Sequence, residues 1–381
     1  MKKTLVLKLL LSIIIFAFLS CKDPIFYTIS MEKKPIPPLI NGSPTNFVVF
    51  NNKMYTASGV ILYEYSGTKA DDASTGIWNK IIPGGQILQL AATNTTLYAL
   101  CLESGKYVLR KSPDWNIISG NKNVYSIYAF GHELFIGSGE ISNNSNKFNI
   151  SVLYGDDIKK LIDTGNKLIN GIAFNGAKYY LSAKDLANES GGCIFAFNAG
   201  VLTLDQVIGD NNPFMGIINL DNTTIAAITR KGDLYSVTPS DANKTGHTMG
   251  DKLATGALAT WEDKGGRRLL LAGRQDEMKN TANYVYGYLE LELESSKPNG
   301  IKDGAAFREP GIIPVSTITT ADGNGIYTST IGKHAVNQIF QVPSDIDPNM
   351  TLFASTQQNG VWSYRNRKTG STPGRQWNAE E

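Results

Sequence analysis

Residues 47–65, FVVFNNKMYTASGVILYEY, decide the fold class of this chain. Two apolar stretches flank Asn51-Asn52, and asparagine tolerates the positive φ angles of a tight hairpin turn. A third apolar stretch begins at Val60 and contains Leu62-Tyr-Glu-Tyr65. Short runs of β-branched and aromatic residues separated by turn residues are typical of antiparallel strands. The segment therefore predicts three consecutive strands joined by tight turns.

The same pattern recurs along the chain. In each unit the second strand carries an aromatic or aliphatic residue followed by small residues, as in Tyr55-Thr-Ala-Ser58. The intervals between these landmark residues run from 37 to 57 residues, except for a last interval of 26. A period in the forties is typical of four-stranded propeller blades. The landmarks are Tyr55, Tyr98, Phe135, Tyr180, Ile225, Leu270, Tyr327 and Phe353.

An all-β fold, a β-propeller of four-stranded antiparallel blades, follows from a physical argument. A lone four-stranded sheet with two apolar faces buries neither, whereas stacked sheets closed into a ring bury both. Because the last interval is short, we expect Tyr327 and Phe353 to share one blade, which gives seven blades, with six and eight as alternatives. A strand at Ile25–Ile29 is available to close the ring.

The first and last units share a second signature. Tyr65 is followed 13 residues later by Trp78-Asn79, and Tyr364 is followed 13 residues later by Trp377-Asn378. Trp115-Asn116 repeats the tag in the second unit. The pattern indicates true repetition rather than chance.

The N-terminus has the features of a bacterial lipoprotein signal peptide. Three lysines precede the apolar run Leu9–Leu19, and Leu19-Ser20-Cys21 places a small residue directly before a cysteine. We expect residues 1–20 to be cleaved, Cys21 to be the lipid attachment site, residues 21–41 to form a Pro-rich tether, and residues 42–381 to form the propeller. The alternative is an ordinary secretory signal with a chance cysteine, since Phe18 stands where a strict lipobox has leucine.

Composition excludes several functions. Removal of residues 1–20 takes away three lysines and no acidic residue, which leaves 33 Lys and Arg against 34 Asp and Glu. No basic surface therefore predicts nucleic-acid binding. Cys101 and Cys193 lie two units apart, so we expect two buried free thiols rather than a disulfide.

No motif indicates an enzyme, a metal or a cofactor. The histidines at positions 132, 247 and 334 are isolated, and no nucleophile elbow or phosphate-binding loop is present. Asp322-Gly-Asn-Gly325 and Asp345-Ile-Asp347 lack the ligand spacing of a calcium loop, so turns explain them better. Lys231-Gly-Asp233 resembles an adhesion tripeptide, but a hairpin turn requires the same residues.

The lipobox at Cys21, the Pro-rich tether and the repeated Tyr and Trp landmarks resemble bacterial β-propeller lipoproteins of the spirochaete, treponemal type. The resemblance implies a lipid-anchored domain outside the cytoplasm, on the cell membrane or outer membrane. The absence of catalytic motifs, the tether and the near-neutral charge of the mature chain favour a non-enzymatic binding or scaffold module with a protein or glycan partner. The Gly-His and Trp-Asp signatures of WD-type propellers are absent. Two alternatives stay open: a hydrolase or lactonase with its site at the central channel, and a surface adhesin.

Overall fold

The residues that the computed structural model describes all lie between positions 38 and 381. The signal peptide, Cys21, the strand expected at Ile25–Ile29, Tyr327 and the loop Asp322–Gly325 lie outside the described residues. The described residues are 39–68, 76–118, 123–141, 146–154, 157–186, 191–198, 205–238, 242–250, 252–262, 267–276, 287–297, 300–308, 331, 334–366 and 375–380.

Antiparallel strands form seven separate sheets, which we number as blades 1 to 7 in chain order. Blade 1 comprises β1 (Val48–Phe50), β2 (Lys53–Ser58), β3 (Ile61–Thr68) and β4 (Gly76–Ile81). Blade 2 comprises β5 (Gln86–Ala92), β6 (Leu97–Glu103), β7 (Lys106–Lys111) and β8 (Asn116–Ile117). Blade 3 comprises β9 (Val124–Phe130), β10 (Glu133–Ile141), β11 (Asn146–Tyr154) and β12 (Asp157–Gly165).

The other four blades follow the same order. Blade 4 comprises β13 (Lys167–Phe174), β14 (Tyr179–Asp185), β15 (Gly192–Phe197) and β16 (Asp205–Asp210). Blade 5 comprises β17 (Phe214–Asn219), β18 (Ile225–Thr229), β19 (Asp233–Val237) and β20 (Ala242–Thr248). Blade 6 has three described strands, β21 (Lys252–Glu262), β22 (Arg268–Asp276) and β23 (Tyr288–Glu292). Blade 7 comprises β24 (Val336–Gln341), β25 (Leu352–Thr356), β26 (Val361–Asn366) and β27 (Arg375–Ala379).

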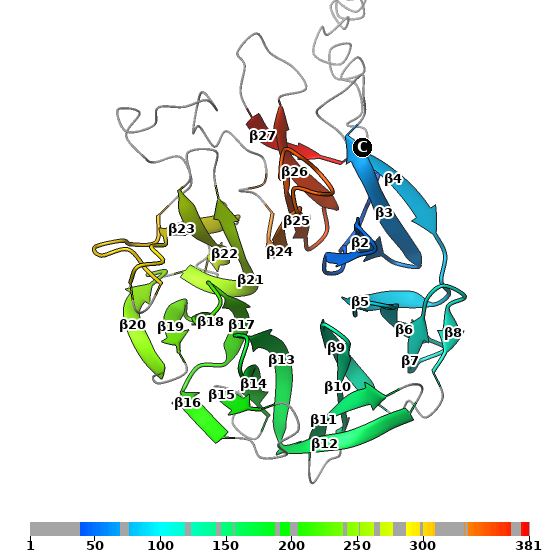
Figure 1. Ribbon diagram of the computed structural model, residues 1–381, viewed down its shortest axis with the longest axis horizontal. Coiled ribbons are helices and arrows are strands. Elements are labelled where there is room, and N and C mark those ends of the chain that lie inside the picture. Colours follow the sequence, from blue (N-terminus) through cyan, green and yellow to red (C-terminus); the bar gives the residue numbers. More distant parts are fainter. Residues whose placement is uncertain are drawn as a thin grey trace, which may run out of the picture. The chain divides into compact units, whose positions relative to one another are not determined.

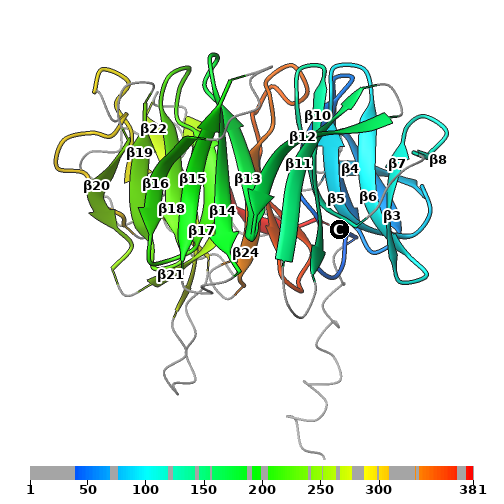
Figure 2. The ribbon, with the colours of Figure 1, turned by 90° about the horizontal axis from the view of Figure 1, so that it is seen from below.

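The blades stand radially around a central axis, with the first strand of each blade innermost (Figure 1). Seen from the side, the strands run along that axis (Figure 2). The architecture confirms the predicted β-propeller and sets the number of blades at seven. Each described landmark lies in the second strand of a different blade, and Phe353 marks blade 7.

Apolar packing follows the stacking argument. The described residues form seven hydrophobic clusters, and each is shared by two neighbouring blades. On β2, Tyr55 and Ala57 pack toward blade 2, whereas Met54 packs toward blade 7. Each sheet therefore buries both of its faces against its neighbours.

The repeated Tyr and Trp residues occupy equivalent positions in blades 1 and 7. Tyr65 pairs directly with Trp78 across β3 and β4, and Tyr364 pairs with Trp377 across β26 and β27. Their ring centroids lie 5.1 Å and 5.8 Å apart. The tag in the second unit does not follow this pattern, because Trp115 lies in the turn before β8 and has a φ of +56°.

Main-chain contacts join blades 7 and 1. The Leu39 amide donates to the Glu380 carbonyl over 2.6 Å, and the Gly360 amide donates to the Gly42 carbonyl over 3.0 Å. Residues 39–42 therefore lie against blade 7 before the chain enters β1. In the described part of the chain, these main-chain contacts help to close the ring of blades between blade 7 and blade 1.

A buried polar network strengthens the same junction. Glu380 is fully buried, and its Oε2 accepts hydrogen bonds from the Gly76 amide and the Trp78 indole, both over 2.8 Å. Its Oε1 lies 3.3 Å from Nε of Arg365, which also donates to the Tyr65 hydroxyl over 2.7 Å. The chain's last described residue thus ties blade 7 to blade 1.

Candidate functional site in the central channel

A pocket of about 420 Å³ lies in the central channel. Its lining residues come from six of the seven blades, mostly from the innermost strands or the segment just before β1. They are carboxamides, hydroxyls, glycines and aliphatic side chains, and none is an Asp, Glu, His, Lys, Arg or Cys.

β-Bulges shape the wall of this pocket. In six innermost strands the pairing register with the second strand shifts, so that at least one residue is left out of the ladder. A bulge bends its strand and re-aims the displaced side chain. The displaced residues are Leu88, Tyr125, Asn170, Met215, Thr255–Ala257 and Asn337.

Carboxamide side chains link neighbouring innermost strands. Asn46 donates to the Leu90 carbonyl over 2.7 Å and accepts from the Leu90 amide over 2.8 Å. Gln89 pairs in the same way with both main-chain groups of Ile127, over 2.7 Å and 3.0 Å. Each side-chain amide thus replaces a peptide group and joins blade 1 to blade 2 and blade 2 to blade 3.

Three further junctions use a single hydrogen bond of the same kind. Asn170 donates to the Phe214 carbonyl between blades 4 and 5. The Thr255 hydroxyl donates to the Val336 carbonyl over 2.6 Å between blades 6 and 7. Gln338 accepts from the Phe47 amide over 2.6 Å and so links blade 7 to blade 1. Most polar groups of the channel wall are therefore committed to holding the ring.

Blade 7 keeps polar groups that the ring does not use. Ser355 is fully buried, and its hydroxyl makes no hydrogen bond within the described part of the protein. It stands directly opposite Gln338 in the β24–β25 pairing. Gln338 uses its oxygen for Phe47, whereas the neighbouring Asn337 is exposed to the channel. One side of the pocket therefore offers unoccupied donors and acceptors.

The other sides of the pocket are less polar. Ile172, Met215, Ile217 and Leu258 contribute aliphatic wall from blades 4, 5 and 6. Tyr128 contributes the one aromatic ring, and burial raises the pKa of its hydroxyl to about 12, so it stays neutral at physiological pH. The geometry suits non-covalent binding of a neutral ligand, because a buried charge would find no partner of opposite sign in these walls.

Catalytic chemistry has little support in the described residues. No three His, Cys, Asp or Glu side chains converge there closely enough to hold a metal ion. His132 lies in the β9–β10 turn, His247 on β20, and His334 beside Trp362 of blade 7, so they lie in three different blades. Cys101 and Cys193 are buried free thiols as predicted, and burial raises the pKa of each to about 11.

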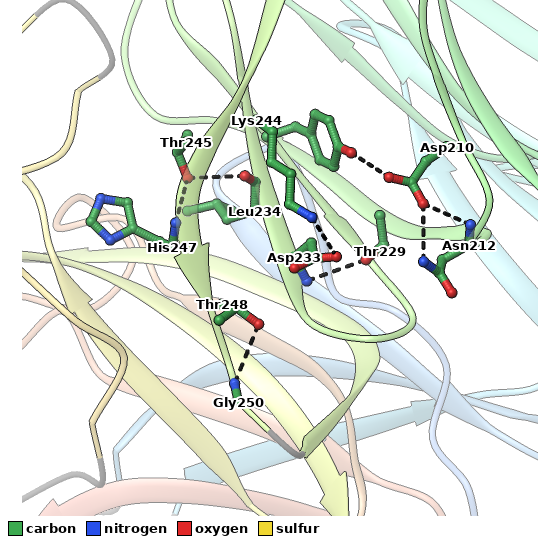
Figure 3. Close-up of polar contacts among 11 residues, drawn as sticks. Asp210, Asn212, Thr229, Asp233, Leu234, Lys244, Thr245, His247, Thr248 and Gly250 are labelled. Atoms are coloured by element: carbon green, nitrogen blue, oxygen red, sulfur yellow. Dashed lines mark hydrogen bonds and ion pairs between the residues drawn. The ribbon is translucent and has the colours of Figure 1, made fainter.

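The tripeptide Lys231-Gly-Asp233 forms the turn between β18 and β19. Gly232 has a φ of +81°, and a Cβ there would lie 2.6 Å from the Cβ of Met249. The Asp233 carboxylate pairs with Lys244 over 2.9 Å, and the Asp233 amide donates a hydrogen bond to the Thr229 hydroxyl (Figure 3). Turn geometry and this ion pair account for the three residues.

The acidic turn at Asp345–Asp347 has a structural role. Asp347 is buried, and its carboxylate accepts hydrogen bonds from Tyr65 over 3.1 Å and Thr351 over 2.6 Å, while Asp345 is exposed. Asp347 therefore holds the β24–β25 loop against blade 1.

Among the described residues, no helix is long and apolar enough to cross a bilayer.

Sequence reasoning did not find Asn337, Gln338 or Ser355 as channel residues. Ser355 belongs to the small residues that follow the Phe353 landmark, and this was the available signal. Because the bulge at Asn337 breaks the alternation of β24, period-two patterning does not indicate which residues face the channel.

Comparisons with known proteins identify the fold alone. No family model and no curated protein matches the chain. The structure is similar to the WD40 β-propeller domain of Doa1, with a TM-score of 0.51, 10% identity, and coverage of 86% of this chain and 93% of that one. It is also similar to YCF48 in a structure titled as bound to D1 peptide, with a TM-score of 0.51, 9% identity, and coverage of 87% and 95%.

Proposed function

We propose that this protein is a lipid-anchored, non-enzymatic binding module of the bacterial cell envelope, which holds a protein or glycan partner at its central channel. The observation that carries the proposal is the uncharged channel wall. Hydrolysis at a channel requires a positioned carboxylate, a histidine or a metal to activate water. The similar propeller described with a bound peptide supports a polypeptide partner by analogy.

The anchor is the second part of the proposal. Cys21 carries the lipid, and the residues between it and Leu39, where the chain packs against blade 7, form the tether. The propeller lies outside the cytoplasm, with no nucleic-acid partner. Cells that express the protein should incorporate radiolabelled palmitate into it and retain it in the detergent phase after phase partitioning. If a Cys21→Ala variant still does both, lipidation at Cys21 is wrong.

The channel is tested by blocking it. Asn337→Cys introduces a reactive thiol at an exposed channel position, whereas the native thiols at 101 and 193 are buried. A bulky maleimide adduct should abolish partner capture from detergent-solubilised envelopes. Tyr107→Cys, labelled identically on the exposed side of blade 2, is the control and should keep the partner. Capture that survives the channel adduct would contradict the proposal.

A further inference from the structure

We infer that the channel pocket takes an uncharged, extended peptide segment, which blade 7 recognises through Asn337, Gln338 and Ser355. This inference deepens the proposed function and rests on it.

Unused hydrogen-bonding groups converge on one side of the pocket. Ser355 has an unpartnered, fully buried hydroxyl, and an unmade hydrogen bond at a buried polar group is costly. The amide nitrogen of Gln338 and both polar atoms of Asn337 make no hydrogen bond within the described residues. The three side chains are adjacent on β24 and β25, and all three line the pocket.

The rest of the ring shows what such groups recognise. Asn46 and Gln89 each pair with both the amide and the carbonyl of one residue on the next blade. A carboxamide has the same donor and acceptor arrangement as a peptide group. Gln338 follows the bulge of β24 as Gln89 follows the bulge of β5, and its amide nitrogen is left over. Asn337, the displaced residue of that bulge, lines the pocket beside it. The main chain of an incoming peptide completes the pattern.

Charge and shape define the peptide further. None of the lining residues is charged, so a charged side chain in the pocket would lose its hydration without gaining a partner. Met215, Ile217 and Leu258 face the ligand with aliphatic surface. A volume of about 420 Å³ lies within the usual range for ligand pockets and admits only a short stretch of chain. Tyr128 is the one aromatic lining residue, so the pocket offers a sugar a single ring for stacking.

The test selects random heptapeptides displayed on phage against the chain from residue 21 with Cys21→Ala. The protein is immobilised through its N-terminus, because Glu380 is buried near the C-terminus. Enriched peptides should share a core without Asp, Glu, Lys or Arg. Synthetic copies should bind at least tenfold more weakly to Ser355→Ala and to Gln338→Glu, which keeps the oxygen that accepts from Phe47 but loses the free nitrogen.

Two serines of blade 7 provide a matched control. Ser355 and Ser363 are both fully buried, but Ser363 donates to Glu380 and accepts from Arg365. Ser363→Ala should lower the melting temperature and leave peptide affinity unchanged. Ser355→Ala should leave the melting temperature unchanged or raise it, and should weaken peptide binding. If the Ser355 hydroxyl had only a structural role, Ser355→Ala would lower the melting temperature and leave peptide affinity unchanged.

Several outcomes overturn the inference. They are no enrichment over uncoated support, enriched peptides with charged cores, unchanged affinity in Ser355→Ala, or saturable binding of the neutral disaccharide chitobiose in place of any peptide. If one of these occurs while the channel adduct still abolishes partner capture, the binding module stands and its peptide ligand is rejected. If no partner is captured at all, the proposed function itself fails.

Discussion

Tyrosine hydroxyls hold several of the partly or fully buried carboxylates of this protein. Three of the pairs connect neighbouring blades, and one lies within blade 1. Burial opposes the charged form of Asp210, but hydrogen bonds from Tyr235 and Asn212 outweigh it and lower the pKa of this carboxyl. The pairs are Tyr55–Glu64, Tyr65–Asp347, Tyr179–Glu133 and Tyr235–Asp210.

Glu380→Ala should destabilise the protein more than any exposed charge change. The substitution removes the carboxylate beside the buried Arg365 guanidinium and leaves the Gly76 amide and the Trp78 indole without their acceptor. Breaking a buried pair costs about 3–5 kcal/mol. Asp303→Ala, which breaks an exposed pair with Lys297, should leave the free energy of unfolding almost unchanged. Urea unfolding measures both, and equal costs would contradict the assignment.

Asp347 should contribute to acid sensitivity. Burial opposes its charged form, but hydrogen bonds from Thr351 and the Asn349 amide, with the Arg365 charge and Tyr65, lower the pKa of this carboxyl. A lowered folded-state pKa gives stability that is complete above the unfolded value of about 4 and is lost as the pH falls through the folded value.

The variant Asp347→Asn should therefore unfold at a lower urea concentration than the wild type at pH 7, and the difference should narrow at pH 3. Asp345→Asn, at an exposed position two residues away, should match the wild type at both pH values. A difference of the same size at pH 7 and pH 3 would show that Asp347 acts without titrating.

At the scale of the strand, the landmark pattern has a physical cause. The second strand of each blade is covered on both faces, and in blades 3, 4, 6 and 7 the small residues after the landmark stand opposite the bulge of the first strand. A Cβ on Gly137 would lie 2.4 Å from the Ser126 hydroxyl, and one on Gly273 would lie 2.4 Å from the Thr255 hydroxyl. Larger side chains do not fit there.

This difference between strands explains how much the sequence could predict. The second strands have a uniform environment, so the blade number and fold class followed from their pattern. The channel did not follow, because the type of residue that links neighbouring blades changes between junctions, from Asn46 to Gln89 to Thr255. The contact between Glu380 and Trp78 joins residues 302 positions apart, and it exists only once the ring has closed.

Blades 5 and 6 meet through glycine. A Cβ on Gly256 would lie 2.4 Å from the Met215 carbonyl oxygen, and the residue has a φ of +94°. Gly246, with a φ of +78°, has open space around it. Gly246→Ala should cost about 1 kcal/mol from backbone strain alone. Gly256→Ala should cost about 3 kcal/mol or more, because the clash adds to the strain. Thermal unfolding of the two variants compares them, and equal losses would exclude the clash.

At the scale of the whole ring, one junction differs from the other six. In blades 1 to 5 the chain passes from the outermost strand of one blade to the innermost strand of the next, whereas the described residues of blades 7 and 1 meet through non-covalent contacts alone. That junction depends on the cluster around Phe353, on the Gln338–Phe47 hydrogen bond and on Glu380. Phe353 contacts Tyr65 and Trp78 with ring centroids 5.2 Å and 5.7 Å apart.

Opening of the ring should therefore begin between blades 7 and 1. Local opening has its own free energy, which the weakest contacts set. In Glu380→Ala, amide hydrogen exchange should accelerate at Leu39, Phe47, Gly76 and Val361, which lie at this junction. Exchange in β14 and β18, on the far side of the ring, should keep the wild-type rate. Mass spectrometry of peptic fragments resolves these regions. Uniform acceleration through all seven blades would mean that the ring opens only as a whole.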